Sequence, residues 1–264
     1  MADGKELNAY GVELEQRLKL KTFPLAVKLL KKEEDAPEKA IRPRRDLGSE
    51  IALCQGFSMS RRQGETVALF LKDMRCYSPV LALGMAKPPE YYLEGNTYFP
   101  KHVGKLELAA NLARNFARLE YGTCIGVASA PLRKADFQPD MVIVYCDSAQ
   151  LRSLLAGLKY TQGELVTSTM EPASACVQAM VPVLKSGKCQ VAVPCGGDRK
   201  WGLAQDDEMI FTIPREKLPD LMSGLRHIDE EGSVFPIKFG VKMGYPLEES
   251  YFTVSRIIGM DVQK

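Results

Sequence analysis

The sequence has no long apolar run, no strong charge of either sign and no apolar leader. Its apolar stretches are strand-length, such as Met141–Cys146, far below the roughly 20 residues of a membrane span. Residues 1–6 have neither an apolar core nor a cleavage site, so we expect no signal peptide. Its 35 Lys and Arg against 33 Asp and Glu give a formal net charge of +2, which offers no case for nucleic-acid binding. We therefore expect a cytoplasmic protein with no nucleic-acid partner and no membrane partner.

Several common enzyme and metal motifs are also missing. No G-x-S-x-G supports a serine hydrolase, and neither the Walker spacing nor the dinucleotide-binding spacing of glycines occurs. The absence of C-x-x-C argues against a zinc ribbon, a bacterial ferredoxin segment and a thioredoxin-like motif. Only two histidines, His102 and His227, are present, too few and too isolated for a histidine-based zinc site.

Apolar periodicity predicts strands and helices that interleave along the whole chain, which favours an α/β or α+β fold with a mixed sheet flanked by helices. We expect a single domain over residues 1–264, with two lobes at approximately 1–120 and 121–264. The tyrosine-rich stretch Lys87–Lys101 either walls a pocket or packs as an irregular connection. The predicted strands are 24–30, 66–71, 124–128, 141–146, 164–169, 190–193, 208–213 and 234–244, and the main predicted helices are 5–20, 49–62, 105–119, 151–158, 171–184, 214–225 and 248–258.

Seven cysteines remain, and an internal repeat divides them. A helix with Cys54, a glycine ten residues on, an apolar strand and Cys76 form one unit. A helix with Cys176, a glycine eleven residues on, another strand and Cys195 form a second. If the two halves pack about a pseudo-twofold axis around a central cleft, these four cysteines meet at one site.

The other three cysteines differ in their surroundings. Cys124 and Cys146 lie in strand-like apolar runs and Cys189 begins one, so we expect three buried, inert thiols. Four converging thiolates would suit an iron–sulfur cluster, or zinc as the alternative. Four ordinary cysteines with no metal remain an equally weighted alternative.

The segment Cys195–Arg199 is the densest local signal. Gly196 and Gly197 allow close backbone approach, their amides could form an anion nest, and Arg199 would add a charged fork. We expect these three residues to bind substrate, with Cys195 and Arg199 as catalytic candidates. The alternative is a glycine turn whose Asp198 and Arg199 pair at the surface. Oxygen ligands at 206–208 could bind a divalent ion, although flanking a strand is the simpler role.

These motifs resemble the domain of unknown function 169 family, also called ArCR, over about residues 8–260. The resemblance rests on a cysteine before an Arg-x-Gly turn, a cysteine before an apolar helix ending in glycine, a helix cysteine and the Cys-Gly-Gly-Asp-Arg loop. It implies a cytosolic prokaryotic protein without a settled activity. It also implies that Cys54, Cys76, Cys176, Cys195 and Arg199 belong to a family site. Tyr77-Ser78-Pro79 departs from the small glycine-rich turn expected after Cys76.

Our leading hypothesis is a redox or metal-assisted protein whose four cysteines hold an iron–sulfur cluster, an oxidoreductase if it is an enzyme. Its partner would be a small anionic substrate or an electron-transfer protein, and a homodimer is the candidate assembly. Two alternatives stay open. One is a non-catalytic small-molecule or metal-binding module with structural zinc, and the other is an enzyme with Cys195 as nucleophile.

Overall fold

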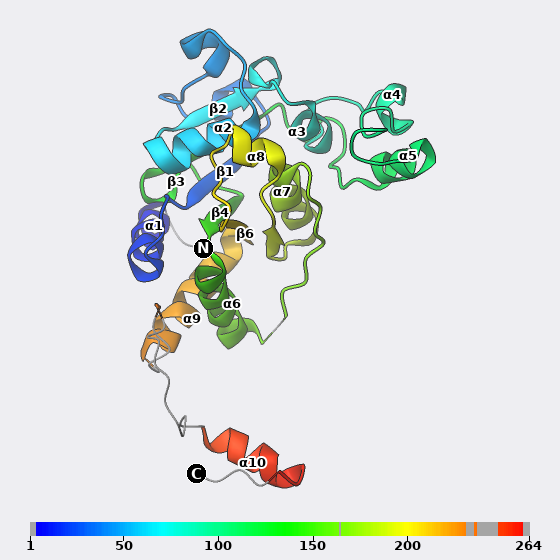
Figure 1. Ribbon diagram of the computed structural model, residues 1–264. Helices are drawn as coiled ribbons and strands as arrows, with labels where there is room; N and C mark the ends of the chain where they lie inside the picture. The colour runs from blue at the N-terminus through cyan, green and yellow to red at the C-terminus, as the bar shows by residue number, and fades with distance from the viewer. Residues whose placement is uncertain (1–3, 164, 231–234, 237–247, 261–264) are drawn as a thin grey trace.

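The computed structural model describes residues 4–163, 165–230, 235–236 and 248–260. Its centre is a six-stranded sheet in the order β2–β3–β1–β4–β6–β5, and all the strand pairings in the described chain are antiparallel. Helices cover both faces of the sheet (Figure 1). The predicted α/β class, a sheet flanked by helices, is confirmed. The strands are β1 (Leu25–Leu30), β2 (Val67–Phe70), β3 (Gly126–Pro131), β4 (Met141–Cys146), β5 (Gln190–Ala192) and β6 (Met209–Pro214).

The strand order has the same arrangement on either side of the central β1–β4 pair. β3 pairs with both β1 and β2, and β6 pairs with both β4 and β5. Both β3 and β6 end in a proline and lead into a single 3₁₀ turn, at Leu132–Lys134 and Arg215–Lys217. Each half of the sheet thus holds three strands in an equivalent order, while superposition of the halves about one axis stays a prediction.

Alternation along β4 shows how the sheet separates two cores. Met141, Ile143 and Tyr145 belong to one core, and Val142, Val144 and Cys146 belong to the other. This is the period of two that places successive strand side chains on opposite faces. The second core is covered by α1 (Gly4–Leu18), α6 (Ser148–Gln162) and α9 (Leu218–Glu230), and the first by α2 (Leu53–Ser58), α3 (Tyr77–Ala82) and α7 (Ala175–Ser186).

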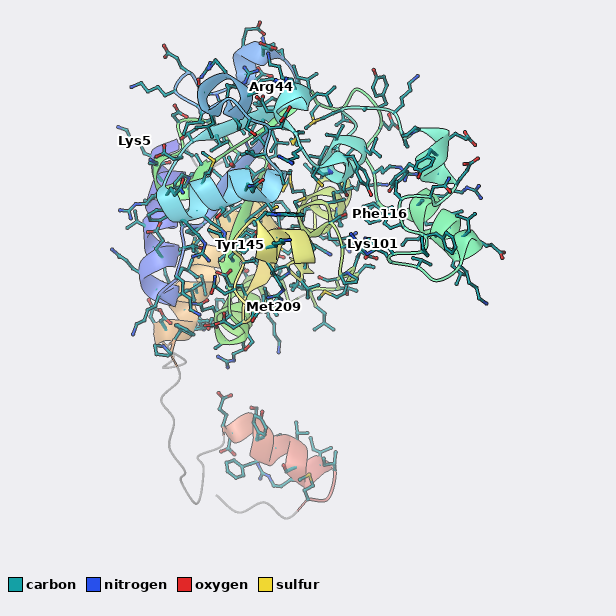
Figure 2. The ribbon with its side chains drawn as sticks, turned by 45° about the horizontal axis from the view of Figure 1, so that its top comes forward. Lys5, Arg44, Lys101, Phe116, Tyr145 and Met209 are labelled. Carbon is teal, nitrogen blue, oxygen red and sulfur yellow. The ribbon has the colours of Figure 1, made fainter. Side chains whose placement is uncertain are left out.

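A short helix, α8 (Gly196–Lys200), follows β5 on the face that carries α2 and α7. An arm formed by α4 (Glu90–Leu93) and α5 (Leu106–Asn115) projects beside α3 and has a small core of its own (Figures 1 and 2). In that core the Tyr92 and Tyr98 hydroxyls lie 3.1 Å apart and Tyr98 packs against Phe116. The tyrosine-rich stretch therefore packs as a connection, and the cavity described below shows that it also walls a pocket.

Some predicted elements differ from the structure. Residues 165–169 form no strand, so that prediction is wrong, although they run beside β5. The Val191 amide donates to Ser168 Oγ and the Gln190 side chain donates to Thr169 O, so side-chain bonds replace a strand ladder there. The predicted strand 234–244 lies almost wholly outside the described residues. The C-terminal helix is present as α10 (Glu249–Ile257). Short 3₁₀ or π turns lie at Glu33–Asp35, Pro43–Leu47, Met59–Gln63 and Leu71–Asp73.

Candidate functional site

The four cysteines of the predicted repeat line one cavity of about 840 Å³. Its walls come from both halves of the chain, with residues 52–112 on one side and 171–201 on the other. None of these four cysteines forms a disulfide. Cys124, Cys146 and Cys189 are buried in the cores, which confirms the predicted burial of those three, while their inertness stays a prediction. The structure thus divides the seven cysteines as the sequence pattern does.

Each cysteine of the cavity stands at the beginning of a helix. Cys54 and Cys176 are the second residues of α2 and α7, while Cys76 and Cys195 are the N-cap residues of α3 and α8. Side chains there lie close to backbone N–H groups that have no partner within the helix. The Asp198 amide donates to Cys195 Sγ over 3.4 Å, and backbone hydrogen bonds from Gln55 and Ser78 reach Cys54 and Cys76.

Burial and the repulsion of neighbouring charges oppose ionisation of Cys54, Cys76 and Cys176 in the absence of a cation. Burial raises the pKa of Cys54 to about 12, with further increases from the charges of Asp198, Cys195 and Cys76. Burial likewise raises the pKa of Cys76, and it raises the pKa of Cys176 well above its usual value, with all three other cysteines adding to the effect. The four sulfurs therefore lie close enough to influence one another electrostatically. A bound cation would reverse this balance, because metal coordination deprotonates a thiol.

The four thiols line the cavity, but their sulfur atoms are not arranged around a common centre. Among the described residues, no three His, Cys, Asp or Glu side chains are placed so that they could hold a metal ion. Rotation between staggered side-chain conformers moves a cysteine sulfur by roughly 3 Å. Four thiols are a donor set that suits a soft metal centre. To bind one, the cysteine side chains would have to rotate toward a common point in the cavity.

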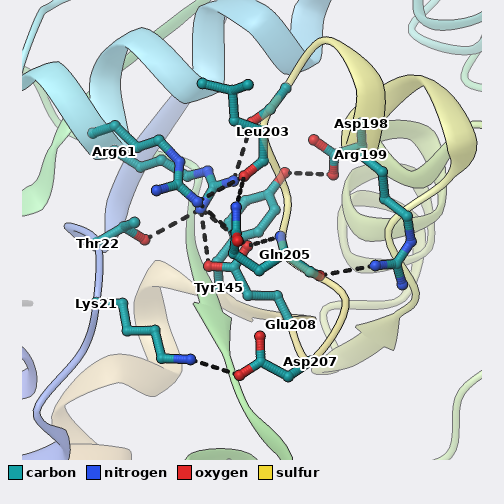
Figure 3. Close-up of polar contacts among 12 residues, drawn as sticks. Lys21, Thr22, Arg61, Tyr145, Asp198, Arg199, Leu203, Gln205, Asp207 and Glu208 are labelled. Atoms are coloured by element: carbon teal, nitrogen blue, oxygen red, sulfur yellow. Dashed lines mark hydrogen bonds and ion pairs between the residues drawn. The ribbon is translucent and has the colours of Figure 1, made fainter.

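A buried polar network contacts the segment of residues 195–202, which begins with one of the cavity cysteines (Figure 3). The Arg61 side chain is fully buried and donates to both carboxylate oxygens of Glu208, at 3.1 and 3.3 Å, and to the carbonyl of Gly202 at 3.1 Å. Its guanidinium carbon lies 3.9 Å from the centre of the Tyr145 ring. The Tyr145 hydroxyl donates to Asp198. These contacts join the turn Met59–Gln63, strand β4 and the residue before β6 to the segment that carries Cys195.

Asp198 links this network directly to the cysteines. It is 1% exposed, its amide donates to Cys195 Sγ, and its Oδ1 atom has no hydrogen-bond partner. Burial raises the pKa of its carboxyl group to about 6, against the opposing effects of Tyr145 and Arg61. The sequence offered a surface Asp198–Arg199 pair as one alternative, and that expectation is wrong, because Asp198 is buried and faces Tyr145.

The other residues of the Cys-Gly-Gly-Asp-Arg segment separate into two groups. Gly196 and Gly197 line the cavity with Cys195. Arg199 is not among the cavity-lining residues, since it donates to Gln205 O and pairs with Asp206 at 3.1 Å. The adjacent acidic residues are paired too, Asp207 with Lys21 and Glu208 with Arg61 (Figure 3). All three carboxylates at 206–208 are therefore engaged with cations, and flanking β6 is their structural role.

Several residues that face the cavity were not singled out as site residues from the sequence. They are Tyr98, Lys101 and His102 from the arm and Lys200 and Trp201 at the end of α8. The cavity-lining positions 196, 197, 200 and 201 follow helical spacing, so a helix after Cys195 would have predicted Lys200 and Trp201. For Arg61, Tyr145 and Glu208 the sequence gives no comparable signal, because they are far apart in the chain.

The fold and cavity define the protein as an α/β protein whose four-cysteine pocket is lined by residues of α2, α3, α7, α8 and the arm. The chain belongs to the domain of unknown function 169 family, described as uncharacterised ArCR, whose model matches residues 13–224 and so spans all four cysteines. It is 24% identical over 227 residues to an uncharacterized protein of Methanocaldococcus jannaschii, covering 85% of this chain and 96% of that protein. No solved structure matches. None of the helices in the described ranges is long and apolar enough to cross a membrane.

Proposed function

We propose that the cavity holds an iron–sulfur cluster bound by Cys54, Cys76, Cys176 and Cys195, in a redox or metal-assisted protein that acts on a small anionic molecule or relays electrons. One observation carries the proposal: these four free thiols line one cavity, although the chain separates them into two distant pairs. Three other cysteines are packed into the apolar cores.

The surroundings of the sulfurs agree with this role. Backbone N–H groups are directed at three of the four, and hydrogen bonds to sulfur, together with charge and exposure, set the potential of a bound cluster. Burial in an apolar wall makes four unpaired thiolates costly, so a cation is the natural counterpart of this donor set. Loop and helix termini from both halves supply the ligands, and no C-x-x-C spacing is needed.

With all four cysteines as ligands, a bound cluster would supply single-electron transfer. The chain itself would hold the sulfurs, exclude bulk water with the apolar residues of α3 and the arm, and fix the Cys195 loop through Asp198 and Tyr145. The polar network of Arg61, Glu208, Tyr145 and Asp198 is buried and its members are hydrogen-bonded to one another or to their neighbours. It therefore limits how far the backbone at Cys195 can shift when a ligand binds.

Anaerobic purification, followed by iron and sulfide assay and electron paramagnetic resonance of the reduced protein, tests the proposal. We expect iron and acid-labile sulfide together, with a cluster signal that is lost when any one of the four cavity cysteines is replaced by alanine. Cys124→Ala, Cys146→Ala and Cys189→Ala are matched controls, and each should keep the cluster. Protein that stays iron-free after reconstitution with iron and sulfide would contradict the proposal.

The same preparations separate the two alternatives. A structural zinc site would show zinc without sulfide, and its cysteine variants would lose thermal stability with no redox signal. A thiol enzyme would show selective alkylation of Cys195 at neutral pH in metal-free protein. Neither pattern is expected if the four thiols serve one cluster.

A further inference from the structure

The cavity is larger than a metal centre needs, and its basic residues indicate what fills the rest. A metal–sulfur bond is about 2.3 Å for zinc, so a centre at the cysteines would occupy a small part of about 840 Å³. Ligand pockets of small organic molecules span about 300–1,000 Å³. The cavity therefore has room for a small organic molecule beside the four thiols.

Three basic side chains border this space from two separate elements. Lys101 and His102 come from the arm, and Lys200 ends α8. Figure 2 shows Lys101 on the side of the arm that faces α7 and α8. Neither lysine has a carboxylate within ion-pair distance in the described part of the chain, and Lys200 Nζ instead lies 5.5 Å from the centre of the Trp201 ring. Their charges are therefore not neutralised by a described partner.

The acidic content of the lining is small. Glu171 is the one carboxylate among the lining residues, and its Oε1 accepts a hydrogen bond from the Ala173 amide. Apart from Glu171 and the four thiols, the lining holds two lysines and a histidine, which come from the arm and the end of α8. The local balance favours a ligand with negative charge.

The remaining wall is apolar and aromatic. Tyr98, Val103 and Leu112 from the arm face the same space as Pro79 and Trp201. Cys195 begins α8 and Lys200 ends it, about 7 Å apart along the helix axis. An anionic group held by Lys200 would thus leave the body of a small molecule between the aromatic wall and the sulfurs.

We infer that the cavity binds a small organic anion, a carboxylate or a phosphate ester with an aromatic or apolar body, whose charged group is held by Lys101, His102 and Lys200. The inference rests on the proposed function, because it names the class of molecule that the cysteine site would act on. It assigns the charged contact to residues of the arm and of the end of α8. Arg199 pairs with Asp206 and has no part in the proposed anion contact.

The single tryptophan of the chain gives a direct test, because Trp201 lines this cavity. Three nitroaromatic quenchers of tryptophan fluorescence differ only in their polar group: para-nitrobenzoate, para-nitrophenyl phosphate and para-nitrobenzyl alcohol. We expect both anions to quench Trp201 at lower concentration than the alcohol, in metal-free and in reconstituted protein alike. The more potent anion then identifies the charged group as carboxylate or phosphate. Equal potency of all three would overturn the inference.

Substitutions separate recognition of charge from packing. In Lys101→Gln/Lys200→Gln we expect anion affinity to fall about fivefold, the effect of one well-placed exposed ion pair, and affinity for the alcohol to stay the same. The control Lys105→Gln removes an exposed lysine of the same segment that does not line the cavity, and should leave all affinities unchanged. Anion affinity that survives the double substitution, or that is lost in Arg199→Gln instead, overturns the assignment.

The outcome is independent of cluster formation. Both lysines are exposed, so the variants should fold, and iron and sulfide content in the double variant should match the parent protein. Loss of the cluster in cysteine variants with anion binding intact would leave the inference standing, and the reverse would leave the cluster proposal standing.

Discussion

The Tyr145 hydroxyl donates a 2.9 Å hydrogen bond to Oδ2 of Asp198, which joins a central strand to the helix that begins at Cys195. Both side chains are buried, and Asp198 holds Cys195 Sγ through its own amide. The hydrogen bond between Tyr145 and Asp198 thus anchors the start of α8, where Cys195 lies, to the central sheet. The bond also helps Asp198 to stay ionised in an apolar setting, because it lowers a carboxyl pKa that burial raises.

Tyr145→Phe should destabilise the protein by about 1–3 kcal/mol, since it leaves a buried carboxylate oxygen without its donor. Loss of the hydrogen bond should also raise the pKa of Asp198 further above about 6. Urea unfolding at neutral pH measures the first effect. Tyr91→Phe, at an exposed tyrosine, is the control and should change stability little. Equal changes in the free energy of unfolding for the two substitutions would show that the Tyr145–Asp198 hydrogen bond does not stabilise the protein.

Arg61→Met should cost about 3–5 kcal/mol, because it removes the fully buried cation of the pair and leaves the buried Glu208 with only the longer, 3.8 Å contact to Arg62. The double variant Arg61→Met/Glu208→Gln should be less destabilised than the sum of the single variants, since their charges are coupled. A double-mutant cycle from denaturant unfolding measures this coupling. The exposed pair Arg45–Asp46 serves as comparison, and Arg45→Met should change stability little. Additive effects at Arg61 and Glu208 would contradict the proposed coupling.

Gly202→Ala should disturb both Asp198 and the cysteine cavity. An added Cβ would lie 2.2 Å from Asp198 Oδ1, 2.8 Å from Asp198 O and 3.0 Å from Cys54 Cβ. Such overpacking costs typically about 1–3 kcal/mol, and here it should also reduce cluster loading. Gly196→Ala is the matched control in the same segment, because nothing lies within 4 Å of its added Cβ. Thermal unfolding and iron content distinguish the two variants, and equal behaviour would contradict the close packing at Gly202.

Glu13→Gln should weaken the contact of α1 with α9 in a pH-dependent way. Arg226 donates to both oxygens of Glu13, at 2.9 and 2.6 Å, and together with Arg17 it lowers the carboxyl pKa below its usual 4.5. A lowered folded-state pKa gives stability that is present above pH 4.5 and is lost as the pH falls through the folded value. The variant should therefore be less stable than the parent at neutral pH, and the difference should shrink in acid. Unfolding curves across this pH range measure it, with the exposed Glu38→Gln as control. A difference that is constant with pH would rule out the Glu13 charge as its cause.

The sequence predicted the fold class and the grouping of the cysteines because both depend on local patterns. Apolar alternation marked β4, and apolar surroundings marked Cys124, Cys146 and Cys189 as core residues. The repeat placed the other four together without any information on distance. Arg61 and Glu208 could not be paired in this way, because 147 residues separate them and no local pattern links the two positions.

Local context also pointed in a misleading direction at Arg199. Two preceding glycines suggested a loop, in which a neighbouring arginine would share the space of Cys195. Instead the segment forms the helix α8, whose turn directs Lys200 and Trp201 into the cavity and Arg199 toward Asp206. The strand predicted over 164–169 was wrong for a related reason: residues 165–169 bond to β5 through side chains, since Ser168 Oγ accepts from the Val191 amide and the Gln190 side chain donates to Thr169 O.

The chain passes from one half of the sheet to the other between β3 and β4, and this has a consequence for how the site is encoded. A chain cut between residues 131 and 141 would leave Cys54 and Cys76 on one fragment with β1–β3, and Cys176 and Cys195 on the other with β4–β6. Each fragment would carry two thiols and half a sheet, and only their reassociation along the β1–β4 seam would restore the quartet. One polypeptide thus contains two parts that each supply half of the cavity. If the two parts were expressed from separate genes, assembly of the four-thiol site would report whether the fragments had reassociated.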